Sequence, residues 1–305
     1  MTAIIVFWAG VGLCLAPFVS PPMALAGGLL FAALFAHPCK QSCGRWIKIL
    51  LQFSVVGLGF GLNFGEVVRA GSTGVVFTAV SITLTLGGGL LLGRWLAVGK
   101  KTAFLVSAGT AICGGSAIAA VAPVVEADEH EIAVALGTVF LLNAAALFIF
   151  PPVGHLLGLS PHQFGLWSAI AIHDTSSVVG AAARYGDEAL KIATTVKLTR
   201  TLWIIPLALG TAAVLHHRKA KIVFPYFIIG FVAASLVVSL VPALDAEYRG
   251  VVAAAKKGLT ITLFLIGTGL SRDTLRTVGV RPVVQGVLLW GGVALASLYA
   301  VLHAA

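Results

Sequence analysis

Long apolar stretches recur along the whole chain, and they limit the fold more than any other feature. A helix that crosses a bilayer needs roughly 20 mostly apolar residues, with about 17 to 25 tolerated. Scanning on that basis predicts eleven spans, at residues 3–17, 22–36, 47–64, 72–97, 102–124, 130–150, 163–183, 190–215, 222–241, 251–271 and 282–303. The connections between them are short, so there is no room for a soluble domain. We expect residues 1–305 to form a single all-α polytopic membrane domain with about eleven transmembrane helices.

Composition excludes the main soluble classes. Of the 305 residues, 59% are hydrophobic and 10% are charged, and the mean hydropathy is +1.02. Soluble domains carry about 25% charged residues, because their surfaces face water. The sequence therefore excludes a soluble enzyme, a nucleic-acid-binding module and a disordered protein, and it makes the lipid bilayer the first partner of this chain.

The basic residues predict an orientation. The net charge is +9, from 20 Lys and Arg against 11 Asp and Glu. Twelve of the basic residues fall in alternate connections, which the positive-inside rule assigns to the cytoplasm. They are Lys40, Arg45, Lys48, Arg94, Lys100, Lys101, Arg218, Lys219, Lys221, Arg272, Arg276 and Arg281. We expect a bacterial inner (plasma) membrane protein with its N-terminus in the cytoplasm and its C-terminus outside. The acidic cluster at 126–131 falls on the outer side in this scheme.

The stretch 102–124 contains adjacent glycines at mid-membrane depth. Gly114 and Gly115 weaken a helix there, and Ser116 follows them directly. A second half-helix starting near Ser116 would aim free N–H groups at the bilayer centre, which is an anion site. The alternative is close helix packing through small residues. We interpret the pattern as a broken helix.

The stretch 163–183 contains consecutive polar residues within apolar flanks, namely His173, Asp174, Thr175, Ser176 and Ser177. An Asp at the bilayer centre costs about 2.5 kcal/mol or more, so it should face the bundle interior with a partner. Asp, Thr and Ser also favour helix N-caps. A half-helix could therefore begin here too. The alternative is a loop at the membrane surface.

Two basic residues fall within the stretch 190–215. Lys197 and Arg200 stand at i, i+3 and so share one helix face. They could extend to the outer interface, or they could be buried cations that pair with Asp174 or bind an anionic substrate. Asn143, in the stretch 130–150, is more typical of an interhelical hydrogen bond than of a ligand contact.

A weak internal similarity hints at a repeat. Residues 59–63 read Gly-Phe-Gly-Leu-Asn, and residues 267–271 read Gly-Thr-Gly-Leu-Ser. Their spans run in opposite directions in the predicted topology, as an inverted-topology repeat requires. A packing motif without common ancestry explains the similarity nearly as well.

Three motifs together resemble the YeiH-like sulfate exporter family, a branch of the cation/proton antiporter and bile-acid symporter superfamily. They are the runs 113–123 (Cys-Gly-Gly-Ser-Ala-Ile-Ala-Ala-Val-Ala-Pro), 173–181 (His-Asp-Thr-Ser-Ser-Val-Val-Gly-Ala) and 196–200 (Val-Lys-Leu-Thr-Arg). The resemblance implies an inverted-repeat bundle with discontinuous crossed helices, core and panel domains, elevator-type alternating access and often a homodimer. A five-plus-five repeat would pair the fifth span with the tenth, whereas polar content pairs the fifth with the seventh, so the crossing partner stays open.

These observations favour a secondary active transporter of a small anion, such as sulfate or another sulfur oxyanion, and not an enzyme. The expected substrate-binding residues are Gly114, Gly115, Ser116, Thr175, Ser176, Lys197 and Arg200, and the expected coupling residues are Asp174 and His173. No Gly-x4-Gly-Lys-Ser/Thr motif is present, so an H⁺ or Na⁺ gradient or the substrate gradient would supply energy. We expect no cofactor, and the four cysteines lack the spacing of a metal site. The alternatives are an intramembrane serine hydrolase using Ser116 and His173, or an anion channel.

Overall fold

In the computed structural model, the residues described are 2–35, 38, 40–65, 67–68, 75–214, 226–269 and 279–303. All regular secondary structure in these ranges is helical. The α-helices are α1 (Thr2–Leu13), α2 (Pro21–Leu34), α3 (Lys40–Gly59), α5 (Val75–Trp95), α6 (Lys100–Ala111), α7 (Gly115–Val121), α8 (Glu129–Leu156), α9 (Pro161–Ala171), α10 (Thr175–Tyr185), α11 (Asp187–Thr201), α12 (Ile204–Val214), α13 (Tyr226–Leu240), α14 (Asp245–Gly269) and α16 (Val280–His303). A 3₁₀ turn, η1 (Pro242–Leu244), precedes α14.

The helices have the length and composition of a membrane protein. Four helical segments in the described ranges are long and apolar enough to cross a bilayer: Glu129–Leu156, Asp187–Val214, Pro242–Gly269 and Val280–His303. Shorter apolar helices occur at Thr2–Leu13, Met23–Leu34 and Tyr226–Leu240. Large apolar side chains such as Trp95 and Phe53 are exposed on the outer surface, where a lipid solvent would cover them. The prediction of an all-α membrane protein is confirmed.

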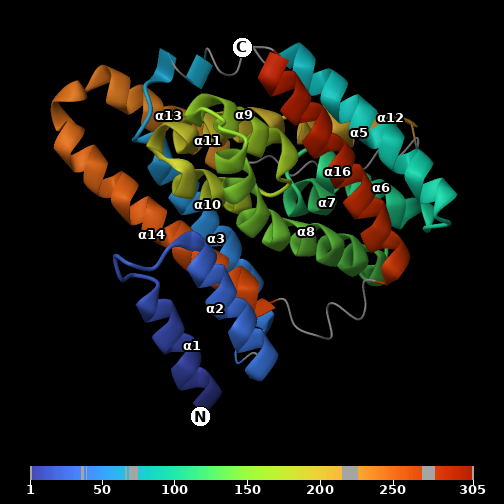
Figure 1. The fold of residues 1–305 in the computed structure, drawn as a ribbon, viewed down its shortest axis with the longest axis horizontal. Coiled ribbons are helices and arrows are strands. Elements are labelled where there is room, and N and C mark those ends of the chain that lie inside the picture. The colour runs from blue at the N-terminus through green and yellow to red at the C-terminus, as the bar shows by residue number, and fades with distance from the viewer. Residues whose placement is uncertain are drawn as a thin grey trace.

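The helices pack as two groups. One group contains α1, α2, α3, α13 and α14, and the other contains α5 to α12 and α16. In Figure 1, α1, α2, α3 and α14 lie on the left, with α10 beside α3 in this view; α5, α6 and α16 lie on the right, and α8 runs between them. The groups meet mainly where α10 packs on α2 and α14. A large cluster of buried apolar side chains joins them, with Leu25, Leu147 and Leu263 among its members.

The glycines of the two similar motifs allow close packing of helices. A Cβ added to Gly267 of α14 would lie 2.6 Å from the Leu25 carbonyl oxygen and 3.0 Å from the Gly28 Cα of α2. A Cβ added to Gly59 of α3 would lie 2.5 Å from the Phe231 carbonyl oxygen of α13. Both glycines let helix backbones approach closely. The end of the second motif, at 270–271, lies outside the described residues.

The stretch 102–124 does not cross the membrane as predicted. The Lys101 Nζ donates a hydrogen bond of 2.6 Å to the Glu126 carbonyl oxygen. A continuous helix would separate these residues by about 37 Å, at 1.5 Å per residue. A Cβ added to Gly109 of α6 would likewise lie 2.9 Å from the Ile118 Cδ1 of α7. Helices α6 and α7 therefore form a hairpin that returns to the side from which it enters, hereafter hairpin 1.

The stretch 163–183 is a hairpin as well. The rings of Phe164 and Tyr185 stack with centroids 3.8 Å apart, although a continuous helix would separate these residues by about 31 Å. The Tyr185 hydroxyl donates to the Leu159 carbonyl oxygen at 2.6 Å, and His155 stacks on the same ring. Helices α9 and α10 therefore form a second hairpin, hereafter hairpin 2. The Phe164 and Tyr185 contact closes its base.

Helix α8 separates the two hairpin bases. Its 28 residues span about 42 Å, and hairpin 1 ends just before its start while hairpin 2 begins just after its end. The hairpins thus enter from opposite sides. This arrangement corrects the predicted crossing of 102–124 and 163–183, and it moves the acidic cluster 126–131 to the side of Lys100 and Lys101. The length of the apolar stretches did not predict the hairpins, because one crossing helix and two folded-back half-helices contain similar apolar stretches.

The two returns cancel in the count of crossings, so they leave the predicted sides of the other basic connections unchanged as predictions. Helix α1 begins at the bottom of the view in Figure 1 and α16 ends at the top, so the two ends of the chain lie on opposite sides of the molecule. Of the twelve basic residues counted above, five fall outside the described residues, namely Arg218, Lys219, Lys221, Arg272 and Arg276.

Candidate functional site

The tips of the two hairpins touch each other. Gly114 is the N-cap of α7, and Asp174 is the N-cap of α10. A Cβ added to Gly114 would lie 3.4 Å from both the Cα and the Cβ of Asp174, and 3.3 Å from Val139 near the middle of α8. The tips therefore meet halfway along α8. The crossing partner left open by the sequence is thus the polar stretch at 173–177, whereas α14 packs chiefly on α2 and α3.

Hairpin 1 turns at a glycine for a steric reason. Gly114 has φ +66° and ψ −124°, a conformation in which a Cβ would clash with the backbone. The Gly114 N–H donates to the Gly109 carbonyl oxygen at 2.8 Å, which closes the turn. Helix α7 then begins without a side-chain cap and contains only seven residues. Gly115 is half-buried and Ser116 is exposed, so the Ser116 hydroxyl remains accessible at this tip.

Hairpin 2 turns at a carboxylate that caps its own second helix. An Asp174 carboxylate oxygen accepts hydrogen bonds from the Ser176 N–H at 3.0 Å and the Ser177 N–H at 3.4 Å. The Ser176 hydroxyl donates to the same oxygen. The predicted half-helix start at Asp174 is confirmed. The chain's own carboxylate occupies the N-terminus of α10, and Ser176 directs both of its donors inward.

Lys197 and Arg200 bind the other ends of the broken helices. Both side chains are buried, with exposed fractions of 0% and 1%. The Lys197 Nζ donates to the Ile172 carbonyl oxygen at the end of α9, at 2.7 Å. Arg200 donates to the Ala111 carbonyl oxygen at the end of α6 and to the Ser81 hydroxyl of α5. Each cation thus lies at the negative end of a half-helix. These contacts favour the buried alternative and exclude extension to the interface.

Two basic side chains and one carboxylate lie at the hairpin tips. Lys197 and Arg200 are basic, and Asp174 is the one carboxylate among the tip residues named above. The partial charges of the two helix C-termini oppose those of the two N-termini, so the helix ends largely cancel. No ion pair joins either basic side chain to Asp174 in the described residues. An anion at the tips would pair with basic side chains that lack a carboxylate partner there, and burial makes such pairing favourable because an uncompensated buried charge is costly.

The geometry of a catalytic relay is missing among the described residues. His173 is fully buried, and neither of its ring nitrogens has a hydrogen-bond partner there. Ser116 is exposed on α7, while Asp174 bonds to its own helix. A hydrolase would need the serine and the imidazole within hydrogen-bond reach. In the same ranges, no three His, Cys, Asp or Glu side chains gather as metal ligands would.

Asn143 makes the interhelical hydrogen bonds that the sequence predicts, and these bonds place it in the site. Its Oδ1 accepts the backbone N–H groups of His173 and Asp174, both at 3.1 Å.

A short repeated pattern in the sequence marks the two hairpin tips. Ala111-Ile112 recurs sixty positions later as Ala171-Ile172, and the same offset aligns Gly114 with Asp174 and Ser116 with Ser176. Each hairpin is also followed by a long helical segment, in opposite directions, as in an inverted repeat.

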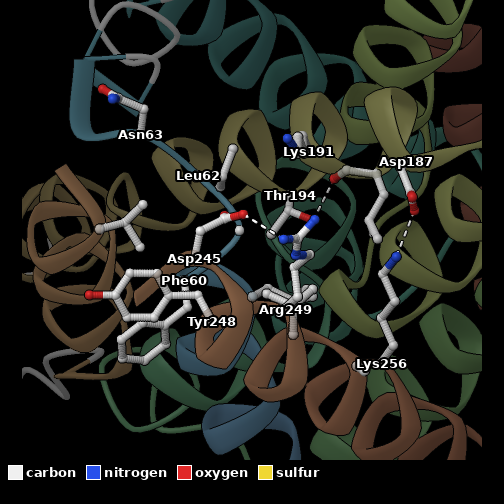
Figure 2. A pocket seen from close by; sticks show the side chains of 16 residues that line it. Phe60, Leu62, Asn63, Asp187, Lys191, Thr194, Asp245, Tyr248, Arg249 and Lys256 are labelled. Atoms are coloured by element: carbon white, nitrogen blue, oxygen red, sulfur yellow. Dashed lines mark hydrogen bonds and ion pairs between the residues drawn. The ribbon is translucent and has the colours of Figure 1, made fainter. Parts of the chain in front are cut away.

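A cavity of about 560 Å³ opens between the two helix groups. It lies among the end of α3, the start of α11, the end of α13 and the start of α14, on the side of the hairpin 2 base. Figure 2 shows its charged lining residues, which are Asp187, Lys191, Asp245, Arg249 and Lys256. The Lys256 Nζ lies 2.6 Å from an Asp187 carboxylate oxygen and thereby links α14 to α11. We call this cavity the vestibule.

The vestibule approaches the hairpin tips along α11. Thr194 lines the cavity and is buried, with its hydroxyl bonded to the Leu190 carbonyl oxygen. Lys197 follows Thr194 by three residues, which corresponds to about 4.5 Å along the helix axis. The vestibule therefore ends about one helical turn from the cations that bind the hairpin tips.

Comparison with known proteins places this architecture in a family. A family profile described as conserved hypothetical protein 698 matches residues 3–286. A UPF0324 membrane protein of Bacteroides thetaiotaomicron is 51% identical over 286 residues, which cover 92% of this chain and 86% of the relative. A UPF0324 membrane protein of Vibrio vulnificus is 47% identical over 292 residues and covers 94% of each chain.

Further relatives extend over nearly the whole length. A UPF0324 membrane protein of Shewanella oneidensis is 46% identical over 299 residues, which cover 98% of this chain and 95% of the relative. No solved structure gives a significant match. The helical hairpins and apolar helices described above agree with relatives that are named membrane proteins. The chain belongs to the UPF0324 family of membrane proteins.

Proposed function

We propose that this protein is a secondary active transporter of a small anion and that the hairpin tips hold the substrate. The observation that carries the proposal is the pair of buried basic side chains at the tips, Lys197 and Arg200, neither of which has an ion pair with the single carboxylate there, Asp174. An isolated charge at this depth is expensive. A bound anion would offset it.

Opposed hairpins suit transport because each tip is connected to one side of the membrane. Hairpin 1 and hairpin 2 enter from opposite sides and meet halfway along α8. Irregular backbone at such depth is tolerated inside protein or along a cavity. A motion of one helix group past the other, as in an elevator mechanism, would transfer the tips between the two sides. The Asp187–Lys256 pair spans the two groups and would break in such a motion.

The roles of the polar residues follow from their contacts. The Ser116 hydroxyl is exposed and would donate to the substrate, next to Gly114 and Gly115 at the tip of hairpin 1. Thr175 and Ser176 would shape the opposite wall. Lys197 and Arg200 would contribute charge from their positions at the helix ends, and their substrate contacts would be secondary to those caps.

Asp174 and His173 would couple transport to an ion gradient. Asp174 is half-buried at the point of contact between the tips, and His173 has two ring nitrogens without partners among the described residues. Their position beside the contact between the tips is the basis for this coupling role. We extend the proposal to H⁺ as the coupling ion, with Na⁺ as the alternative, and to sulfate or another sulfur oxyanion as the substrate.

The setting of the protein follows the basic residues and the resemblance. We propose a bacterial inner membrane location with a cytoplasmic N-terminus and an outer C-terminus, in a homodimer. Lys100 and Lys101 at the base of hairpin 1 would then face the cytoplasm, and the vestibule would face outward. The isolation of Ser116 from the His173 ring supports transport over serine hydrolysis.

The test is uptake into proteoliposomes. Radiolabelled sulfate, thiosulfate and acetate are offered under a pH gradient and under a Na⁺ gradient. We expect saturable uptake of at least one anion by the wild type and a loss of more than tenfold in Asp174→Asn and Arg200→Ala. Lys100→Ala, at the exposed base of hairpin 1, is the matched control and should transport normally. Equal uptake by all variants would contradict the proposed site, and linear flux without saturation would indicate a channel.

A further inference from the structure

Asn143 lies at the centre of the molecule with half of its hydrogen-bonding capacity unused. It is near the middle of α8, between the hairpins, and its exposed fraction is 3%. Its Oδ1 accepts two backbone N–H groups from the tip of hairpin 2. Its Nδ2 is buried and has no hydrogen-bond partner among the described residues.

The orientation of this amide follows from its contacts. Two N–H donors point at one end of the Asn143 side chain, so that end must be the oxygen, and the NH₂ group must occupy the other end. If the Asn143 amide were rotated by about 180°, its NH₂ group would face the His173 and Asp174 N–H donors. The two Nδ2 hydrogens are therefore held away from hairpin 2 by the same bonds that hold its tip.

A buried donor without an acceptor calls for an explanation. Native proteins leave few such groups, because desolvation of an unpaired donor costs free energy. Arg200 has a second unpaired buried donor at Nε, and its guanidinium binds the end of α6 at hairpin 1. A buried donor that has no protein acceptor in the described ranges thus lies beside each tip, from α8 in one case and α11 in the other. A ligand with several acceptor atoms could bond to such donors.

We propose that Asn143 is a substrate-recognition residue whose Nδ2 donates a hydrogen bond to an oxygen of the transported anion. This inference rests on the proposed function and identifies a residue that contacts the anion directly. A ligand with oxygen acceptors, such as an oxyanion or a carboxylate, would fit, whereas a cation would meet the positive end of the amide dipole. Because its Oδ1 holds hairpin 2, Asn143 also links the presence of substrate to the position of that tip.

Asn143→Asp separates recognition from structure. The Asp side chain has the same shape and retains an oxygen for the His173 and Asp174 N–H groups, but it replaces the donor with a charged acceptor. We expect the KM for uptake of the transported anion to rise more than tenfold. Thermal stability in detergent is measured in parallel, because a buried carboxylate also changes the free energy of unfolding. An unchanged KM in a folded variant would indicate a purely structural Asn143. Gln163→Glu is the matched control, because the Gln163 Oε1 also accepts a backbone N–H, at the distant base of hairpin 2.

A second measurement needs no active variant. The chain contains two asparagines, Asn63 and Asn143, so protein labelled with ¹⁵N in the asparagine side-chain amide gives two pairs of signals. Asn63→Asp removes one pair and thereby assigns both. We expect saturating sulfate, thiosulfate or acetate, whichever anion is transported, to shift the Asn143 pair more than the Asn63 pair, which belongs to a residue that lines the vestibule.

The outcomes are distinguishable. Saturable uptake by the wild type together with an unmoved Asn143 signal would overturn the role of Asn143 and leave the transporter proposal standing. An unchanged KM in a stable Asn143→Asp variant would overturn it in the same way. Absence of saturable uptake of all three anions by the wild type would overturn the proposed function itself.

Discussion

The two hairpins differ most at the residue where the second helix begins. Hairpin 1 turns at Gly114, which has a positive φ and leaves α7 without a side-chain cap. Hairpin 2 turns at Asp174, which has an extended backbone and caps α10 with its carboxylate. The tip of hairpin 1 is set by backbone geometry and leaves Ser116 exposed. At the tip of hairpin 2, the Asp174 carboxylate caps its own helix. The comparison teaches that two hairpin tips in contact can be built differently, with one accessible at Ser116 and the other closed by its own carboxylate.

The hairpins also differ in how their first helices end. Arg200 caps α6 and reaches Ser81 of α5, so it connects hairpin 1 to a neighbouring helix. Lys197 binds carbonyl oxygens at the end of α9, with the Ile172 oxygen at 2.7 Å and the Ala169 oxygen at 3.4 Å. One face of α11 therefore binds both hairpins. Arg200 links hairpin 1 to a second helix, α5, whereas both partners of Lys197 lie at the end of α9.

The largest expected effect concerns the sides of the hairpin bases. In a variant without native cysteines, His130→Cys and His162→Cys should react with a membrane-impermeant thiol reagent from opposite sides. We expect His130→Cys to share its side with Lys100→Cys, and His162→Cys to share its side with Lys191→Cys, because each hairpin returns. Two crossing spans would reverse both pairings, so the labelling pattern decides between the topologies without regard to magnitude.

The second effect compares the two cations. We expect Arg200→Met to lower the free energy of unfolding by about 3 kcal/mol, since it strands a buried carbonyl oxygen and the Ser81 hydroxyl. Both substitutions stop burying a basic group, which offsets part of the loss. Lys197→Met should cost about 1 kcal/mol, because its lost partners are confined to the end of α9. Denaturant titration in detergent measures both. A larger loss for Lys197→Met would contradict the view that hairpin 1 depends more on its cation.

The third and smallest effect compares two glycines with positive φ. Gly114 has φ +66° at the tip of hairpin 1, and Gly158 has φ +63° in the loop after α8 with no neighbour within 4 Å of an added Cβ. We expect Gly158→Ala to cost about 1 kcal/mol through backbone strain alone. Gly114→Ala should cost about 1 to 3 kcal/mol and should also reduce uptake, because it shifts the contact with Asp174. Equal uptake by Gly114→Ala and Gly158→Ala would show that the turn of hairpin 1 is not needed for transport.

Much of this architecture could be read from local patterns. Helix breaks at Gly114 and at Asp174 were predictable, because adjacent glycines weaken a helix and Asp caps one. The importance of Lys197 and Arg200 followed from charge in an apolar stretch. Their partners did not, since the carbonyl oxygens of Ile172 and Ala111 become acceptors only where the hairpins end. The interhelical hydrogen bond expected of Asn143 is confirmed, but its partners, the His173 and Asp174 N–H groups, could not be read from a single amide in a helix.

By itself, the sequence determined that the helices lie in lipid, that the fold is all-helical, and that helices break near Gly114 and Asp174. Apolar length, helix propensity and capping act over a few residues, so a local stretch of sequence is enough to show them. Only the tertiary structure decided that each broken helix folds back, that hairpins from opposite sides meet at Gly114 and Asp174, and that Asn143 lies between them. The physical reason is that a break leaves the direction of the next helix open. Contacts between residues far apart in the chain, such as Phe164 with Tyr185 and Lys101 with Glu126, choose that direction.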